Sequence, residues 1–173
     1  MLLIALAGLP GSGKSGLARP LAQALPAAVL DKDRVRAALF PPEEIEYSAS
    51  QDDLVMEAIF LAAAFLLRKE RTVILDGRLY ARAYQVQRLL AFAQEVQAPL
   101  KLIECTAPDE VIRLRLEADT SAGRHPAQNR GYAMYCQIKA AADPILFSHL
   151  VVDTSRPLAD CLADCLKYLR ESS

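Results

Sequence analysis

Eight consecutive residues near the start of the chain have the types and spacing that bind a phosphate chain. Residues 8–15 read G-L-P-G-S-G-K-S, an uninterrupted match to the pattern G-x-x-x-x-G-K-[ST]. Successive backbone N–H groups of such a loop surround phosphate oxygens, and the helix that follows points its positive end at the anion. Lys14 is expected to reach the β- and γ-phosphates, and the Ser15 hydroxyl to bind Mg²⁺. The pattern predicts a nucleoside triphosphate site made by Gly8, Leu9, Pro10, Gly11, Ser12, Gly13, Lys14 and Ser15.

A carboxylate follows a second apolar run, Val73-Ile74-Leu75-Asp76-Gly77. An aspartate at the carboxyl end of a strand beside a phosphate loop can hold Mg²⁺, either directly or through water. Strands also end in aspartate simply because this residue forms turns. The glycine-rich loop favours the metal role for Asp76.

A third group of charged residues, D-K-D-R-V-R at 31–36, follows another short apolar run. Asp33 and Arg36 are three apart at a predicted helix start, so their side chains emerge on one face. Asp33 could accept the proton of a substrate hydroxyl that attacks the γ-phosphate, while Arg36 binds an anionic substrate or orients Asp33. Alternatively, Asp31 caps the helix and Asp33 complements its dipole. The residues alone leave both interpretations open.

Short apolar runs that alternate with segments of helical periodicity must position these groups. We expect strands at 2–7, 28–30, 72–75, 100–104 and 150–153, and helices at 14–25, 51–68, 81–96, 106–117, 129–142 and 158–169. Runs rich in Val, Ile and Leu are typical of parallel strands buried on both faces. The alternation predicts one α/β domain over residues 1–173, with a parallel sheet flanked by helices.

Two polar segments follow neither period. Residues 40–49 form a connection, and residues 119–128 read D-T-S-A-G-R-H-P-A-Q. Polar loops with Gly and Pro often supply mobile lids in nucleotide enzymes. We therefore expect a lid at about 118–130.

The composition narrows the classes of function. Lys and Arg total 20 against 21 for Asp and Glu, a net charge of −1, which argues against nucleic acid as the main partner. No apolar stretch approaches the roughly 18 residues that cross a membrane. The four cysteines show no C-x-x-C spacing, which argues against zinc and fits a cytoplasmic protein with reduced thiols.

Taken in order, these motifs resemble the predicted-kinase branch of P-loop ATPases, related to chloramphenicol phosphotransferase, polynucleotide 5′-kinase, gluconate kinase and zeta toxins. The resemblance covers essentially the whole chain, from A-G-L-P-G-S-G-K-S through D-x-x-R at Asp33 and Arg36 to V-I-L-D-G at Asp76 and an arginine-rich lid. It implies a fold like that of nucleoside monophosphate kinases, with a five-stranded parallel sheet in the order 2-3-1-4-5. It also implies that Asp33 is the general base for a hydroxyl acceptor.

The resemblance assigns the lid its own roles. The lid match comprises Arg113, Arg115, Arg124, His125, Pro126, Asn129 and Arg130. Lid arginines in such kinases neutralise the transferred phosphoryl group and stack near adenine. The resemblance places Arg115 near the nucleotide. A common lid entry reads R-L-x-x-R, but here Arg115-Leu116 is followed by Asp119 instead of a second arginine, so Arg124 is the arginine expected at the transition state. Arg113 and Arg115 could equally lie on a solvated helix face, and His125 could be exposed without a role.

The remaining candidates concern the acceptor. Arg78 and Arg82 follow Asp76 and are expected to line its pocket, whereas Tyr47, Tyr80 and Tyr84 either flank the same space or pack on helix surfaces. The sequence thus predicts a kinase that uses ATP and Mg²⁺ to phosphorylate a hydroxyl of a small molecule. The alternatives are a nucleotide-dependent switch ATPase and a polynucleotide end kinase, although N-K-x-D and L-S-G-G-Q strings are missing. The acceptor's identity and the oligomeric state stay open.

Overall fold

All the strands run parallel in one five-stranded sheet, seen in a computed structural model that describes residues 1–121 and 131–171. The strand order is β2-β3-β1-β4-β5, as the resemblance implies. The strands are β1 (Leu3–Ala7), β2 (Ala28–Asp31), β3 (Val73–Asp76), β4 (Leu100–Thr106) and β5 (Leu150–Asp153). The predicted parallel α/β sheet is therefore confirmed.

The connections between strands contain the helices α1 (Lys14–Ala24), α2 (Lys32–Leu39), α3 (Ala49–Arg68), α4 (Ala83–Glu95), α5 (Asp109–Ser121), α6 (Tyr132–Ala140) and α7 (Leu158–Arg170). A short 3₁₀ turn, Pro42–Glu44, lies in the segment expected to be a plain connection. Side-chain oxygens start two of the helices: the Ser48 hydroxyl caps α3, and the Asp31 carboxylate caps α2. The helices therefore begin where cap residues satisfy the first free N–H groups.

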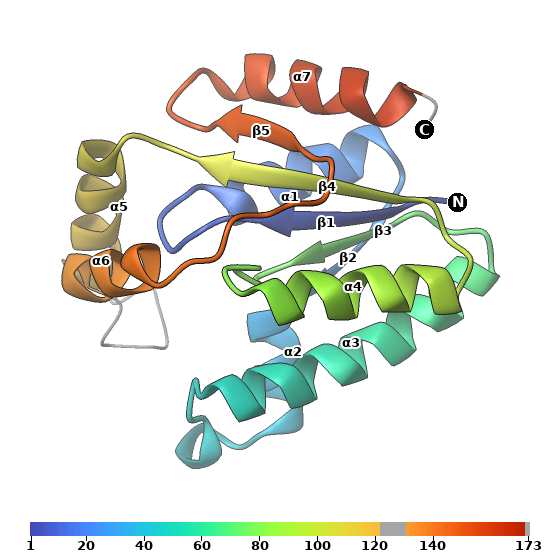
Figure 1. Ribbon diagram of the computed structural model, residues 1–173, viewed down its shortest axis with the longest axis horizontal. Helices are drawn as coiled ribbons and strands as arrows, with labels where there is room; N and C mark the ends of the chain where they lie inside the picture. Colours follow the sequence, from blue (N-terminus) through green and yellow to red (C-terminus); the bar gives the residue numbers. More distant parts are fainter. Residues whose placement is uncertain (122–130, 172–173) are drawn as a thin grey trace.

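The sheet is covered on both faces, because alternate residues of β1 enter two different cores (Figure 1). Leu3, Ala5 and Ala7 pack with residues of α3 and α4. Ile4 and Leu6 pack with residues of α1 and α7, including the buried Cys161 and Cys165. This period of two explains why β1 is apolar throughout.

Helices α5 and α6 lie apart from these layers, beyond the arrowheads of β1 and β4 (Figure 1). A small cluster of Ile112, Leu116 and Tyr135 holds them together and packs on Leu9 of the glycine-rich loop. Helix α5 continues to Ser121, past the expected end at 117, so the first residues of the expected lid are helical. Helix α6 begins at Tyr132 instead of 129. Within the described residues, no helix is both long and apolar enough to span a bilayer.

Candidate active site

The glycine-rich loop connects β1 to α1 at the carboxyl edge of the sheet, and its backbone requires glycine. Gly8 has φ +136°, and a Cβ there would lie 2.4 Å from the Cys105 carbonyl oxygen. Gly13 has φ +86°, and a Cβ would lie 2.7 Å from Thr154 Oγ1. Both positions exclude a side chain by conformation and by contact. The loop therefore passes close to β4 and to the residues after β5.

The Lys14 side chain is buried and extends back over this loop. Its ammonium donates to the carbonyl oxygens of Gly8 at 2.6 Å and Leu9 at 3.0 Å. Helix α1 begins at Lys14 and has no acidic residue in its own first turn, so its N-terminal end is positive. The ammonium and the helix terminus together form a cationic cradle for phosphate.

Asp76 ends β3 next to this cradle and is almost fully buried, with 3% of its surface exposed. Burial raises the pKa of the Asp76 carboxyl above its usual value, while hydrogen bonds from the Ser15 hydroxyl and the Gly77 N–H, and the charge of Lys14, oppose that rise. The two predicted metal ligands, Ser15 and Asp76, therefore contact each other. A buried carboxylate beside a hydroxyl, disfavoured in its charged form, fits a Mg²⁺ site, since a cation would stabilise that charge.

Asp31 and Asp33 have separate roles. Asp31 lies opposite Asp76 in the register of β2 and β3. Its carboxylate accepts the N–H groups of Asp33 at 2.9 Å and Arg34 at 3.2 Å, so Asp31 caps α2, as one interpretation of the sequence held. The Asp33 carboxylate is partly exposed and accepts Arg36 Nη1 at 2.9 Å. The structure therefore brings Asp33 and Arg36 together on one face of α2.

Arg36 is 1% exposed and is surrounded by acidic and aromatic groups. Besides Asp33, its guanidinium pairs with Asp52 of α3 and lies 4.6 Å from the centre of the Tyr47 ring. The equally buried Lys32 contributes Nζ to the same Asp52 carboxylate at 2.7 Å. Asp52 thus binds two buried cations of α2.

Arg78, on the loop after β3, extends this cluster toward α4. It is 4% exposed, pairs with Asp53, and places Nη1 3.9 Å from Asp52 Oδ2. Asp53 also accepts a hydrogen bond from the Tyr84 hydroxyl at 3.2 Å. Sequence reasoning missed Asp52 and Asp53, whose only local signal is two acids in the first turn of a helix.

The Arg82 side chain contacts the segment after α6 and not the cluster around Asp52. Its Nη1 donates to the Ala141 carbonyl oxygen at 2.7 Å, and its Nε lies 3.6 Å from Asp143. The Ala83 N–H donates to the same aspartate at 2.9 Å. Arg82 therefore ties the start of α4 to the segment after α6, and its predicted contact with an acceptor stays a prediction.

Arg115 reaches from α5 to the far side of the glycine-rich loop. Its guanidinium donates to the carbonyl oxygen of Gly11 at 3.1 Å, and to the hydroxyl and carbonyl oxygens of Thr154 at 2.9 and 2.8 Å. A cavity of about 280 Å³ opens beside it, bounded also by Gly13, Leu17 and Arg156. Arg113, by contrast, is exposed and lies 3.6 Å from Glu117, one turn along the same helix.

Part of the predicted lid cannot be placed. Arg124, His125, Pro126, Asn129 and Arg130 lie outside the described residues. The role assigned to Arg124 therefore stays a prediction.

The strand order, the glycine-rich loop and the Lys14–Ser15–Asp76 arrangement define a P-loop nucleotide-binding protein with the kinase type of sheet. The chain belongs to the AAA domain family, which matches it over residues 3–134. No curated protein matches the chain in sequence.

Three of the solved structures that share this fold are described as kinases. A proposed kinase from Chloroflexus aurantiacus J-10-fl is 21% identical, with a TM-score of 0.78 and 98% of each chain covered. The Mycobacterium tuberculosis APS kinase CysC, in complex with AMPPNP and APS, is 18% identical with a TM-score of 0.74, again over 98% of each chain. A gluconokinase from Sinorhizobium meliloti 1021 is 17% identical with a TM-score of 0.71, covering 97% of this chain and 91% of its own. The fold is thus that of P-loop kinases.

Proposed function

We propose that this protein is an ATP-dependent phosphotransferase that moves the γ-phosphate of ATP to a hydroxyl group of a small molecule, with Asp33 as the general base. One observation carries the proposal. Asp33 follows β2, Asp76 ends β3, and the loop with Lys14 follows β1, so base, metal ligand and phosphate cradle share one edge of three adjacent strands. Ligands of parallel α/β sheets bind at this edge.

The donor half would hold ATP by its phosphates and its base. The N–H groups of residues 8–15 and the Lys14 ammonium would bind the phosphates, as in other glycine-rich loops of this pattern. Ser15 and Asp76 would hold Mg²⁺, which neutralises charge on the phosphates when bound. The adenine would occupy the cavity that Arg115 and Gly13 border. The AMPPNP bound to the APS kinase of the same fold supports ATP as the nucleotide.

The acceptor half would deprotonate and align the attacking hydroxyl. The partly exposed Asp33 carboxylate would take the hydroxyl proton, and Arg36 would keep that carboxylate in position through their 2.9 Å contact. Lys14 would stabilise the charge that spreads over the γ-phosphoryl group. Arg124 is proposed as a further cation at the transition state.

Replacing Asp33 by Asn tests this assignment. The variant should lose at least about a hundredfold in transfer rate, since a missing general base typically costs this much, while ATP affinity measured calorimetrically stays nearly unchanged. Asp160→Asn, an exposed carboxylate in the first turn of α7, is the matched control and should transfer normally. Transfer that survives in Asp33→Asn rules out Asp33 as the base.

A screen of hydroxylated metabolites with ADP release as the readout tests the proposed function itself. A kinase hydrolyses ATP slowly alone and releases ADP faster with an acceptor that becomes phosphorylated. A switch ATPase would ignore every metabolite and respond only to a macromolecular partner, which would overturn the proposal.

A further inference from the structure

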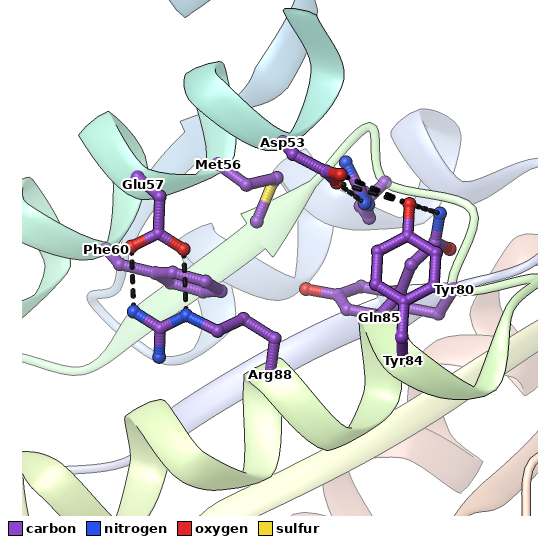
Figure 2. A pocket seen from close by; sticks show the side chains of 9 residues that line it. Asp53, Met56, Glu57, Phe60, Tyr80, Tyr84, Gln85 and Arg88 are labelled. Carbon is purple, nitrogen blue, oxygen red and sulfur yellow. Dashed lines mark hydrogen bonds and ion pairs between the residues drawn. The ribbon is translucent and has the colours of Figure 1, made fainter. Parts of the chain in front are cut away.

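A cavity of about 230 Å³ lies between α3 and α4, beside the cluster that holds Asp53 and Arg78 (Figure 2). Its apolar wall comes from Met56 and Phe60 of α3, and tyrosines 80 and 84 add aromatic surface from the other side. Figure 2 shows the Tyr80 hydroxyl pointing away from its own backbone, toward Met56, Phe60 and Arg88. Ion pairs through Asp52 connect this cavity to Arg36, the partner of Asp33.

Two buried donors on residues that line this cavity have no hydrogen-bond acceptor among the described residues. Tyr80 is 2% exposed and its hydroxyl has no hydrogen-bond partner there. The Nη1 of Arg78 has no hydrogen-bond partner either, although it forms a long ion pair with Asp52 at 3.9 Å. Buried polar groups are otherwise almost always hydrogen-bonded. Two donors without a hydrogen bond, on residues that line one cavity, point to an acceptor group on a ligand.

The backbone holds Tyr80 in this position against its own preference. Tyr80 has φ +54°, a left-handed conformation that is strained for a bulky residue. Its neighbours are fixed on both sides: the Leu79 carbonyl accepts the Gly8 N–H at 3.0 Å, and the Ala81 carbonyl accepts the Asp143 N–H at 2.9 Å. The surrounding structure therefore imposes the direction of the Tyr80 ring.

Each of the four cations around the cavity and along its connection to Asp33 is paired with a carboxylate. Five carboxylates, of Asp33, Asp52, Asp53, Glu57 and Glu95, pair with Lys32, Arg36, Arg78 and Arg88. Arg88 is held by both oxygens of Glu57, at 2.8 and 2.7 Å, and lies over the Phe60 ring. An anionic ligand would have to displace a carboxylate from its cation and would meet Asp53 and Glu57 at the cavity wall. The arrangement therefore disfavours anions.

We propose that the phosphoryl acceptor is an uncharged alcohol with one apolar ring that fills this cavity and a carbonyl-like oxygen that accepts hydrogen bonds from Tyr80 and Arg78. The inference rests on the proposed phosphotransferase function and names the class of its acceptor. An apolar cavity of about 150 Å³ holds benzene, so this volume suits one ring with a few substituents. Met56 and Phe60 supply the apolar contact, and the two donors fix the orientation.

Three alcohols test the class without nucleotide, through dissociation constants from protein NMR titrations. They are 4-(hydroxymethyl)acetophenone, which is neutral with a ring and a carbonyl, 4-(hydroxymethyl)benzoate, its anionic counterpart, and glycerol, which has no ring. The ketone should bind at least about tenfold more tightly than the benzoate, because like charges oppose the anion. Glycerol should cause no saturable shifts. A benzoate that binds as tightly as the ketone overturns the neutral class, and glycerol that binds as tightly overturns the ring.

Two substitutions test the residues. Tyr80→Phe should weaken ketone binding about threefold to tenfold, the value of a typical hydrogen bond. It should also raise the urea midpoint of the free protein, because it removes a buried hydroxyl without a partner. Tyr168→Phe, on α7, is the control and should leave ketone binding unchanged. Asp53→Asn should improve benzoate binding relative to the ketone. A Tyr80→Phe protein that binds the ketone normally, or unfolds at lower urea, refutes the assigned donor.

These outcomes are separate from those of the proposed function. Binding is measured without ATP, so ketone binding that follows the expected pattern stands even if no metabolite is ever phosphorylated. Conversely, equal binding of the anion would overturn the acceptor class while Asp33-dependent transfer remains intact.

Discussion

Asp52 is the carboxylate on which the buried cations of the proposed acceptor half converge. It accepts Lys32 Nζ at 2.7 Å, pairs with Arg36, and has Arg78 Nη1 3.9 Å away. Asp52→Asn keeps the shape of the side chain and one acceptor oxygen but removes the negative charge. The three cations would then share fewer carboxylates in a region shielded from water, so the variant should be strongly destabilised.

The size of this effect follows from burial. Removing one partner of a buried ion pair costs about 3–5 kcal/mol. Asp52 is 23% exposed and asparagine can still accept one hydrogen bond, so we expect the lower end, about 3 kcal/mol. With a urea dependence of about 2 kcal/mol per molar, the unfolding midpoint should fall by about 1.5 M.

Urea unfolding followed by circular dichroism measures this loss, and Asp53→Asn is the matched control. Asp53 is 45% exposed and pairs with Arg78 alone among the cations of the cluster, so its variant should lose about 1 kcal/mol or less. Adding Lys32→Met to Asp52→Asn should recover about 1 kcal/mol or more, because it removes one excess charge. Equal losses at positions 52 and 53, or no recovery in the double variant, would refute the charge argument.

Three further predictions concern the donor half. Gly13→Ala places a methyl group 2.7 Å from Thr154 Oγ1 at a positive φ and should lower the free energy of unfolding by about 1–3 kcal/mol, whereas Gly16→Ala, with open space inside α1, should raise it by up to about 1 kcal/mol. Urea unfolding compares the two, and similar losses at both positions would contradict the steric reason. Asp76→Asn should stabilise the free protein at pH 7, because burial raises the pKa of this carboxyl and so disfavours its charged form in the folded state. The gain should disappear as the pH falls below the ordinary aspartate pKa of 3.8, and Mg²⁺-dependent ATP affinity should drop wherever the wild-type carboxyl is ionised. Arg115→Ala should weaken ADP binding about tenfold or more by calorimetry, since it removes three hydrogen bonds that brace the loop; unchanged affinity would separate Arg115 from the nucleotide.

The donor half could be predicted because its signals are local. The glycines at 8 and 13 are required by backbone angles and contacts within one strand–loop–helix unit, and Lys14 and Ser15 follow at fixed spacing. The strands could also be predicted, since burial on both faces makes β1 wholly apolar and β3 apolar up to Asp76. The metal role of Asp76 was predicted because this loop is nearby, and in the structure the Asp76 carboxyl contacts Ser15.

The acceptor half was hidden because its contacts join distant parts of the chain. Asp52 meets Lys32 and Arg36 across 20 and 16 residues, and Asp53 meets Arg78 across 25. No periodicity marks such pairs, and two acids in the first turn of a helix are common for dipole reasons alone. The sequence left open whether Tyr80 packs on a helix surface or lines a pocket. Its orientation could not be predicted, because its left-handed backbone depends on hydrogen bonds that its neighbours accept from the distant Gly8 and Asp143.

Different interactions fix the shapes of the two halves, so substitutions can change one half without changing the other. Backbone geometry holds the nucleotide loop, where added side chains collide with Cys105 or Thr154. Side-chain ion pairs hold the acceptor half, and its anions Asp52, Asp53 and Glu57 all come from α3. A substitution on the cavity face of α3 can change the charge and shape offered to an acceptor without touching the loop. Specificity for the alcohol should thus be separable from ATP binding.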